Sequence, residues 1–96
     1  MKTTINGNRY NTETCELLAS YDRYSNGNYC GFCVLCLASN GEYLIWRDSN
    51  GQDGSRSSLT LADHDAETPC EFLEGIALSN EQEARLVELN LLKVVD

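Results

Sequence analysis

The chain has 96 residues, of which 42% are hydrophobic, and its formal net charge at pH 7 is −8. This length suits one domain over residues 1–96 with a single modest core, and it excludes a catalytic domain joined to a separate binding domain. The apolar content excludes a disordered acidic tail, and no apolar run is long enough for a signal peptide or a membrane span, so we expect a cytoplasmic protein without membrane contact.

The first part of the sequence predicts a hairpin followed by a helix. Residues 2–10 are expected to form two short strands, because Asn6-Gly7 tolerates the positive φ angles of a tight turn. Apolar residues then recur at helical spacing, with Leu17 and Leu18 on the same side. We therefore expect a short helix over about 12–21.

The strongest local signal is an apolar, β-prone hairpin over 29–48. At its centre, Asn40-Gly41 is the favoured pair for a two-residue type I′ turn, which would place Leu35 opposite Trp46 on one face. In that register both faces of the hairpin are apolar, and the helices can cover only one of them. The other face, around Trp46 and Leu35, is then available for other strands, for a partner or for a homodimer.

The last part predicts a third main strand over 70–78 and a final helix over about 80–90. Ala84 and Val87 share a side of that helix that would face the core. Together these elements predict an α+β fold: a small antiparallel sheet of three to five strands, with the central hairpin, packed against two short helices (about 12–21 and 80–90).

Three of the five cysteines, Cys30, Cys33 and Cys36, are spaced like a metal or iron–sulfur run. A strand would separate Cys30 and Cys36 by about 20 Å, whereas thiolates on one zinc lie within about 4 Å of each other. We therefore expect reduced thiols that pack as small hydrophobic residues, with no metal or other cofactor. A zinc or iron–sulfur protein is the third and least favoured hypothesis.

Two polar segments carry residue types that are used in metal and acid–base sites. His64 lies between Asp63 and Asp65, but sequence neighbours point in different directions, and we expect a solvated loop histidine. Residues 48–54 resemble the start of a calcium loop, yet they lack its glycine position and its bidentate glutamate. Because the sequence also has no nucleophile elbow, phosphate loop or dinucleotide fingerprint, it predicts a protein that is not an enzyme.

Carboxylates are concentrated at the C-terminal end. Residues 62–96 contain nine acids and two bases, whereas residues 1–61 contain six acids and five bases. Solubility is the plainer explanation, but scattered acids would serve it equally well. Segregated acids favour a surface that repels nucleic acid, attracts basic proteins and approximates the spacing of duplex phosphates. The candidate partner-binding residues are Asp63, Asp65, Glu67, Glu71, Glu74, Glu81, Glu83 and Glu88.

Two short motifs resemble a family of small proteins from phages, plasmids and other bacterial mobile elements. Residues 5–13 (Ile-Asn-Gly-Asn-Arg-Tyr-Asn-Thr-Glu) match its Ile-Asn-Gly-x-x-Tyr-x-Thr-Glu opening, and residues 78–83 (Leu-Ser-Asn-Glu-Gln-Glu) are similar to its helix start. The cysteine-rich strand and residues 48–69 depart from the pattern. The resemblance implies a host-takeover or anti-defence role, including that of anti-CRISPR proteins.

Charge and resemblance together predict a non-enzymatic inhibitor in the host-cell cytoplasm. Its expected partner is a host protein with a basic, nucleic-acid-binding surface, such as a CRISPR effector subunit, and we expect no direct contact with nucleic acid. The alternative is a small homodimeric scaffold or regulatory protein that associates through the apolar hairpin face.

Overall fold

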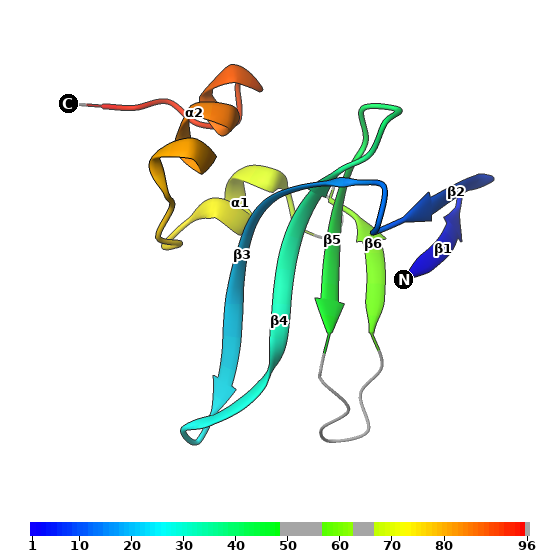
Figure 1. The fold of residues 1–96 in the computed structure, drawn as a ribbon, viewed down its shortest axis with the longest axis horizontal. Helices are drawn as coiled ribbons and strands as arrows, with labels where there is room; N and C mark the ends of the chain where they lie inside the picture. The colour runs from blue at the N-terminus through cyan, green and yellow to red at the C-terminus, as the bar shows by residue number, and fades with distance from the viewer. Residues whose placement is uncertain (49–56, 63–66, 96) are drawn as a thin grey trace.

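The computed structural model describes residues 1–48, 57–62 and 67–95 of the chain (Figure 1). Its strands are β1 (Lys2–Ile5), β2 (Asn8–Asn11), β3 (Glu16–Ser25), β4 (Asn28–Leu37), β5 (Tyr43–Asp48) and β6 (Ser58–Leu61), and its helices are α1 (Pro69–Leu73) and α2 (Asn80–Glu88). The strands form a two-stranded sheet, β1-β2, and a four-stranded antiparallel sheet in the order β3-β4-β5-β6. The predicted α+β class is therefore confirmed.

The predicted N-terminal hairpin is confirmed as the sheet of β1 and β2. Ile5 pairs with Asn8, so a two-residue turn joins the strands. Asn6 and Gly7 have φ angles of 51° and 80°, which are the left-handed values that a type I′ turn requires and that Asn and Gly tolerate best. The hairpin stands next to β6, on the far side of the sheet from α2 (Figure 1).

The helix predicted over about 12–21 is wrong, because residues 12–15 form a turn and residues 16–21 belong to strand β3, which pairs with β4. A register shift between Leu17 and Ala19 inserts one extra residue, so that Leu18 and Ala19 are both buried while Leu17 is 56% exposed. This bulge breaks the strict alternation of a strand and produces apolar spacing that resembles a helix.

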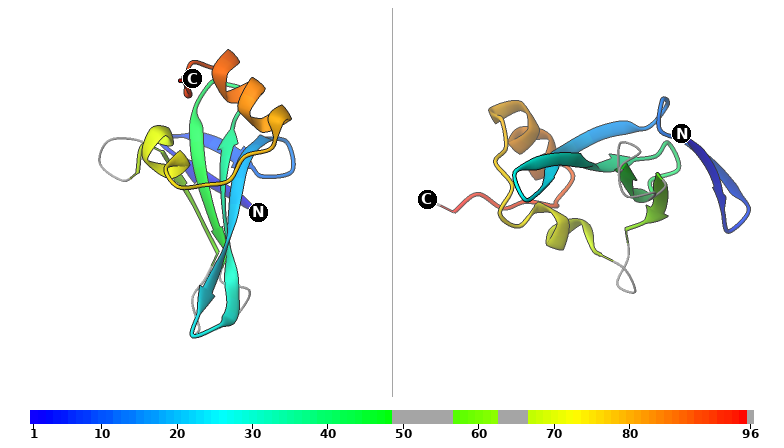
Figure 2. Two further views of the ribbon diagram at one scale, coloured as in Figure 1. Left: turned by 90° about the vertical axis from the view of Figure 1, so that its left-hand side faces the viewer. Right: turned by 90° about the horizontal axis from the view of Figure 1, so that it is seen from below.

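The turn between β3 and β4 is the sequence signal that would have corrected this prediction. Asn26 and Gly27 have φ angles of 52° and 82° and connect the paired residues Ser25 and Asn28. Asn26-Gly27 is thus a second residue pair that favours a type I′ hairpin turn. The polar residues around it favour a loop when only composition is considered. The two long strands extend from it, and the hairpin tip projects away from the helices (Figure 2).

The central hairpin is confirmed, but its predicted register is wrong by one residue. Leu35 pairs with Ile45, and Trp46 pairs with Val34. Gly41, at φ 88°, lies in a longer turn in which its N–H donates to the Ala38 carbonyl at 3.0 Å. A type I turn followed by a left-handed glycine is the usual three-residue hairpin loop, and it shifts the pairing relative to a two-residue turn. The shift moves every side chain of β5 to the other face.

The strand predicted over 70–78 is also wrong, because Pro69 begins the short helix α1. The Thr68 side chain accepts a hydrogen bond from the Glu71 backbone N–H at 3.2 Å, and Pro69 occupies the first turn, where its missing N–H costs no hydrogen bond. Only Phe72 and Leu73 of this helix are buried. These two apolar residues hold the short helix against the sheet. In the sequence they also resemble part of a β-strand.

The final helix is confirmed as α2, although its buried side is not the predicted one. Ser79 forms a capping box, in which its hydroxyl accepts from the Gln82 N–H at 3.2 Å and its N–H donates to Gln82 Oε1 at 2.9 Å. Leu86 is fully buried, whereas Ala84 is exposed and Val87 is 40% exposed. The Leu86 side of the helix therefore meets the sheet. In the part of the chain that the structure describes, no helix is long and apolar enough to cross a membrane.

Apolar side chains pack on both faces of the four-stranded sheet. On the helix-covered face, Phe72, Leu73 and Leu86 pack with residues of β3, β4 and β5; this cluster comprises Leu18, Ala19, Cys33, Leu35, Ile45, Phe72, Leu73 and Leu86. On the opposite face, Tyr10 of the N-terminal hairpin joins a second cluster that comprises Tyr10, Val34, Cys36, Ala38, Leu44 and Leu59. The N-terminal hairpin thus covers part of the face that the sequence left open.

Two cysteines of β4 have the packing role that the sequence predicts. Cys33 and Cys36 are buried on opposite faces of the sheet, and burial raises the pKa of the Cys36 thiol to about 12. A thiol of this kind is a small hydrophobic residue and a poor nucleophile. His64, its neighbours Asp63 and Asp65, and residues 49–54 of the segment that resembles a calcium loop lie outside the described residues.

Candidate functional site

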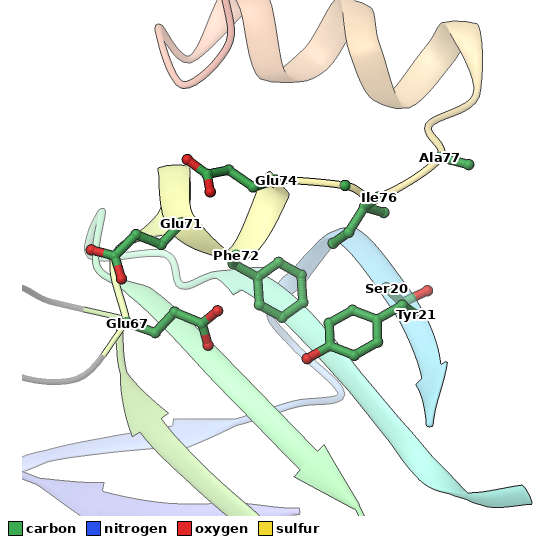
Figure 3. Close-up of a pocket in the computed structure, with 9 residues that line it drawn as sticks. Ser20, Tyr21, Glu67, Glu71, Phe72, Glu74, Ile76 and Ala77 are labelled. Carbon is green, nitrogen blue, oxygen red and sulfur yellow. The ribbon is translucent and has the colours of Figure 1, made fainter. Parts of the chain in front are cut away.

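A groove opens on the helix-covered side, between β3 and α1 (Figure 3). Its volume is about 420 Å³, and three of the predicted partner-binding carboxylates line it. The side chains that define it are Tyr21 of β3, Glu67, Glu71, Phe72 and Glu74 in and around α1, and Ile76 after the helix. We call this feature the β3–α1 groove.

The short helix α1 brings the three carboxylates to the groove. Glu71 lies within α1, Glu67 immediately precedes its N-cap residue Thr68, and Glu74 is its C-cap residue, where the backbone is extended. Phe72 points under the helix into the core, where it is 2% exposed. Figure 3 shows the three carboxylates on one side of the Phe72 ring and Tyr21 on the other.

The groove carries more negative than positive charge. Nη2 of Arg47 donates to Oε2 of Glu67 at 2.9 Å, so this carboxylate already has a cation beside it. Within the described residues, the carboxylates of Glu71 and Glu74 take part in no ion pair and no side-chain hydrogen bond. Both of these residues are exposed. The groove therefore presents two carboxylates that are free to accept donors from outside.

Tyr21 supplies the aromatic wall of the groove. Its ring packs against Phe72 with a centroid separation of 5.3 Å, and 39% of its surface remains exposed. A hydrogen bond with the Cys33 thiol and burial raise the pKa of Tyr21 to about 12, so the phenol stays neutral at physiological pH. Carboxylates beside a neutral aromatic ring form a surface suited to binding a cation.

The predicted carboxylates of α2 are separate from the β3–α1 groove lining. Glu81 and Glu88 are exposed and lie seven residues apart, which is about two turns on the same side of the helix, whereas Glu83 is half-buried. Oε1 of Glu88 accepts a hydrogen bond from Nη1 of Arg85 at 2.9 Å. The structure thus places Glu67, Glu71 and Glu74 together and distributes the other three along α2.

A second ion pair of Arg85 involves a residue that the sequence did not single out. Nε and Nη2 of Arg85 donate to the two carboxylate oxygens of Glu16 at 2.8 and 2.9 Å, which fixes α2 to the start of β3. Such a two-pronged guanidinium–carboxylate contact is geometrically specific. The two residues are 69 positions apart, so no local pattern could have indicated the pair.

Replacing Arg85 by Gln is expected to raise the pKa of Glu16. Hydrogen bonds from Arg85 lower that pKa below its ordinary value of 4.5. A lowered carboxyl pKa stabilises the folded state above about pH 4.5, and this contribution is lost as the pH falls through the folded-state pKa. Carboxyl ¹³C NMR titration of wild type and R85Q measures the change, with R47Q as the control that leaves Glu16 unaffected. An unchanged titration curve in R85Q would contradict the bidentate contact.

The opposite face of the sheet does not form the predicted apolar patch around Trp46 and Leu35. Leu35 is fully buried under the helices, because the one-residue register shift places the two side chains on different faces. Trp46 is half-buried, and its ring meets Phe32 edge-to-face at 5.0 Å. Within the described residues its buried Nε1 has no hydrogen-bond partner. Leu17, which pairs with Cys36, adds an exposed apolar side chain to this face.

The comparisons with known proteins identify no relative. Searches against protein-family models, curated proteins and solved structures give no match to this chain.

Proposed function

We propose that this protein is a non-enzymatic inhibitor whose acidic surface occupies a basic, nucleic-acid-binding surface of a host defence complex, as an anti-CRISPR protein does. The observation that supports it most is the gathering of Glu67, Glu71 and Glu74 at one groove whose described surroundings supply a single paired cation, Arg47. The exposed carboxylates of Glu81 and Glu88 extend the acidic surface to α2.

Such inhibition works by competition between carboxylates and nucleic-acid phosphates for the same basic side chains. A groove that binds nucleic acid presents Lys and Arg side chains to phosphates, and carboxylates fixed on a folded surface satisfy the same donors. The formal net charge of −8 also accelerates the encounter with a basic partner and prevents binding to nucleic acid itself. The resemblance to mobile-element proteins supports a defence complex as the source of that partner.

A competition experiment tests the proposal. Guide-loaded CRISPR effector complexes of several types are mixed with fluorescently labelled target DNA, and DNA binding is followed by anisotropy as this protein is added. We expect at least one complex to lose DNA binding, with stronger inhibition at about 50 mM than at about 500 mM salt, because screening weakens exposed charge pairs. Undiminished DNA binding by every complex at low salt would contradict the proposal.

A homodimeric scaffold or regulatory protein is the second candidate function. The observation that favours it is the face opposite the helices, where Leu17 is 56% exposed and Phe32 and Trp46 are half-buried. If two copies associate through this face, Leu17→Lys should convert the dimer to a monomer in sedimentation at micromolar concentration, while Val87→Lys on α2 should leave it dimeric. A strictly monomeric wild type removes this candidate.

A further inference from the structure

We propose that the β3–α1 groove receives one arginine side chain of the partner as the anchor of the complex. This inference rests on the proposed function and specifies which chemical group the acidic surface recognises. Three features of the groove support it: two carboxylates that have no partner among the described residues, one exposed aromatic wall, and a volume of about 420 Å³. A volume of this order suits a single long side chain better than a folded segment.

The unpaired carboxylates determine the sign and the type of the ligand. Arg47 already neutralises Glu67 at 2.9 Å, so an incoming cation is directed to Glu71 and Glu74. A guanidinium carries five N–H donors in a planar fork and can therefore contact more than one carboxylate oxygen at a time. The contact of Arg85 with both oxygens of Glu16 shows the same chemistry elsewhere on this chain.

The aromatic wall favours arginine over lysine. Phe72 supports the Tyr21 ring from the core side at 5.3 Å, which leaves the exposed part of the ring in a fixed orientation. A planar guanidinium can stack on such a ring while its edges donate to carboxylates, whereas an ammonium group acts as a compact, strongly hydrated charge. Half-buried Ile76 offers an apolar contact for the methylene stem of the same side chain.

The geometry of the groove argues against a metal ion as the ligand. Among the described residues, no three acidic, histidine or cysteine side chains lie close enough together to hold one. Carboxylates that line one side of a groove without converging on a point suit a cation whose charge is spread over a plane. Phosphate or nucleic acid would instead be repelled by the same carboxylates.

A titration with small probes tests the inference directly. Amide ¹H–¹⁵N NMR spectra are recorded as N-acetyl-arginine amide is added, with N-acetyl-citrulline amide as the uncharged control of nearly equal shape. We expect shifts confined to amides of groove residues, such as Tyr21, Gly75 and Ile76, with the arginine probe only. N-acetyl-lysine amide is expected to bind about tenfold more weakly, because it loses the planar stacking and the fork geometry.

Matched variants separate the groove from the general charge of the surface. The double variant Glu71→Gln, Glu74→Gln should lose the arginine-induced shifts, whereas Glu81→Gln, which removes an exposed carboxylate from α2, should retain them. Tyr21→Leu keeps an apolar wall and removes the aromatic ring, and it should eliminate the preference for arginine over lysine. The spectra themselves show whether each variant is folded.

The outcomes distinguish this inference from the proposed function. Equal shifts with the citrulline probe, or shifts spread over α2 and retained in the double Gln variant, would overturn the arginine groove even if the protein inhibits an effector complex. Arginine binding confined to the groove, together with undiminished DNA binding by every complex, would overturn the proposed function and preserve the groove as an arginine site.

Discussion

Reversal of four exposed carboxylates, by Glu71→Lys, Glu74→Lys, Glu81→Lys and Glu88→Lys, is expected to abolish inhibition and to leave the fold intact. Each change from Glu to Lys raises the net charge by two, so the four changes raise the formal net charge from −8 to 0. An exposed ion pair contributes up to about 1 kcal/mol, and reversal replaces attraction with repulsion. Together the four changes should weaken binding by about 3 kcal/mol or more, which is at least about 100-fold in affinity.

The competition experiment measures this loss, and a matched pair of double variants locates it. One double variant carries Glu71→Lys and Glu74→Lys, and the other carries Glu13→Lys and Glu42→Lys. The two variants change the net charge equally, and all four positions are exposed. Only the first pair removes carboxylates from the β3–α1 groove. If the groove carries the interaction, the first pair loses most of the inhibition and the second retains most of it. Full inhibition by the quadruple variant would refute the electrostatic mechanism.

Replacing Leu86 by Ala is expected to have the largest effect on stability. Leu86 is fully buried and is the residue by which α2 enters the cluster beneath the helices. Truncation of a buried leucine costs about 3 kcal/mol through lost transfer free energy and the remaining cavity. For a domain of this size that loss is a large fraction of the total stability and lowers Tm by about 15 °C.

Val87→Ala is the matched control for Leu86→Ala, because Val87 is the next residue of α2 and is 40% exposed. We expect this substitution to change the free energy of unfolding by less than about 1 kcal/mol. Urea denaturation of the two variants compares them directly. Similar losses at the two positions would mean that the Leu86 side of α2 does not face the sheet.

Elements with strong local determinants were predicted correctly. The Asn6-Gly7 hairpin follows from two residues that accept left-handed φ angles, and α2 follows from the Ser79 cap. The packing of Cys33 and Cys36 follows from the extended β4, which separates Cys30 and Cys36 by six residues, or about 20 Å, too far for one metal. In each case the information lies within a few residues of the feature.

Features that depend on how paired strands align were predicted wrongly. The segment 12–21 has a helical apolar spacing only because a bulge at Leu18 turns two consecutive side chains to the same face, and that bulge forms only when β3 pairs with β4. The turn between β4 and β5 is one residue longer than the predicted two-residue turn, and this extra residue shifts the pairing of the two strands by one position. Leu35 and Trp46 therefore lie on opposite faces of the sheet instead of the same face.

The candidate site was predicted in part. Glu67, Glu71 and Glu74 were among the candidates because acidic residues are concentrated in this region, and the structure places them at one groove. Tyr21 was expected on a helix, so its place opposite α1 was not foreseen. The partner, the inhibitory role and the arginine anchor remain predictions that the competition and titration experiments test.

Turn residues, caps and charge are local properties of the chain, so the α+β class, two of the hairpins, the last helix and the excess of carboxylates near the C-terminal end can be predicted from the amino-acid sequence. The folded structure was needed to show which carboxylates lie together, which cations neutralise them and which aromatic ring lines the same groove. Those relations join residues far apart in the chain, such as Arg47 with Glu67 and Arg85 with Glu16. Distance in space depends on strand register and helix rotation, and both are fixed by packing of the whole chain rather than by any single segment.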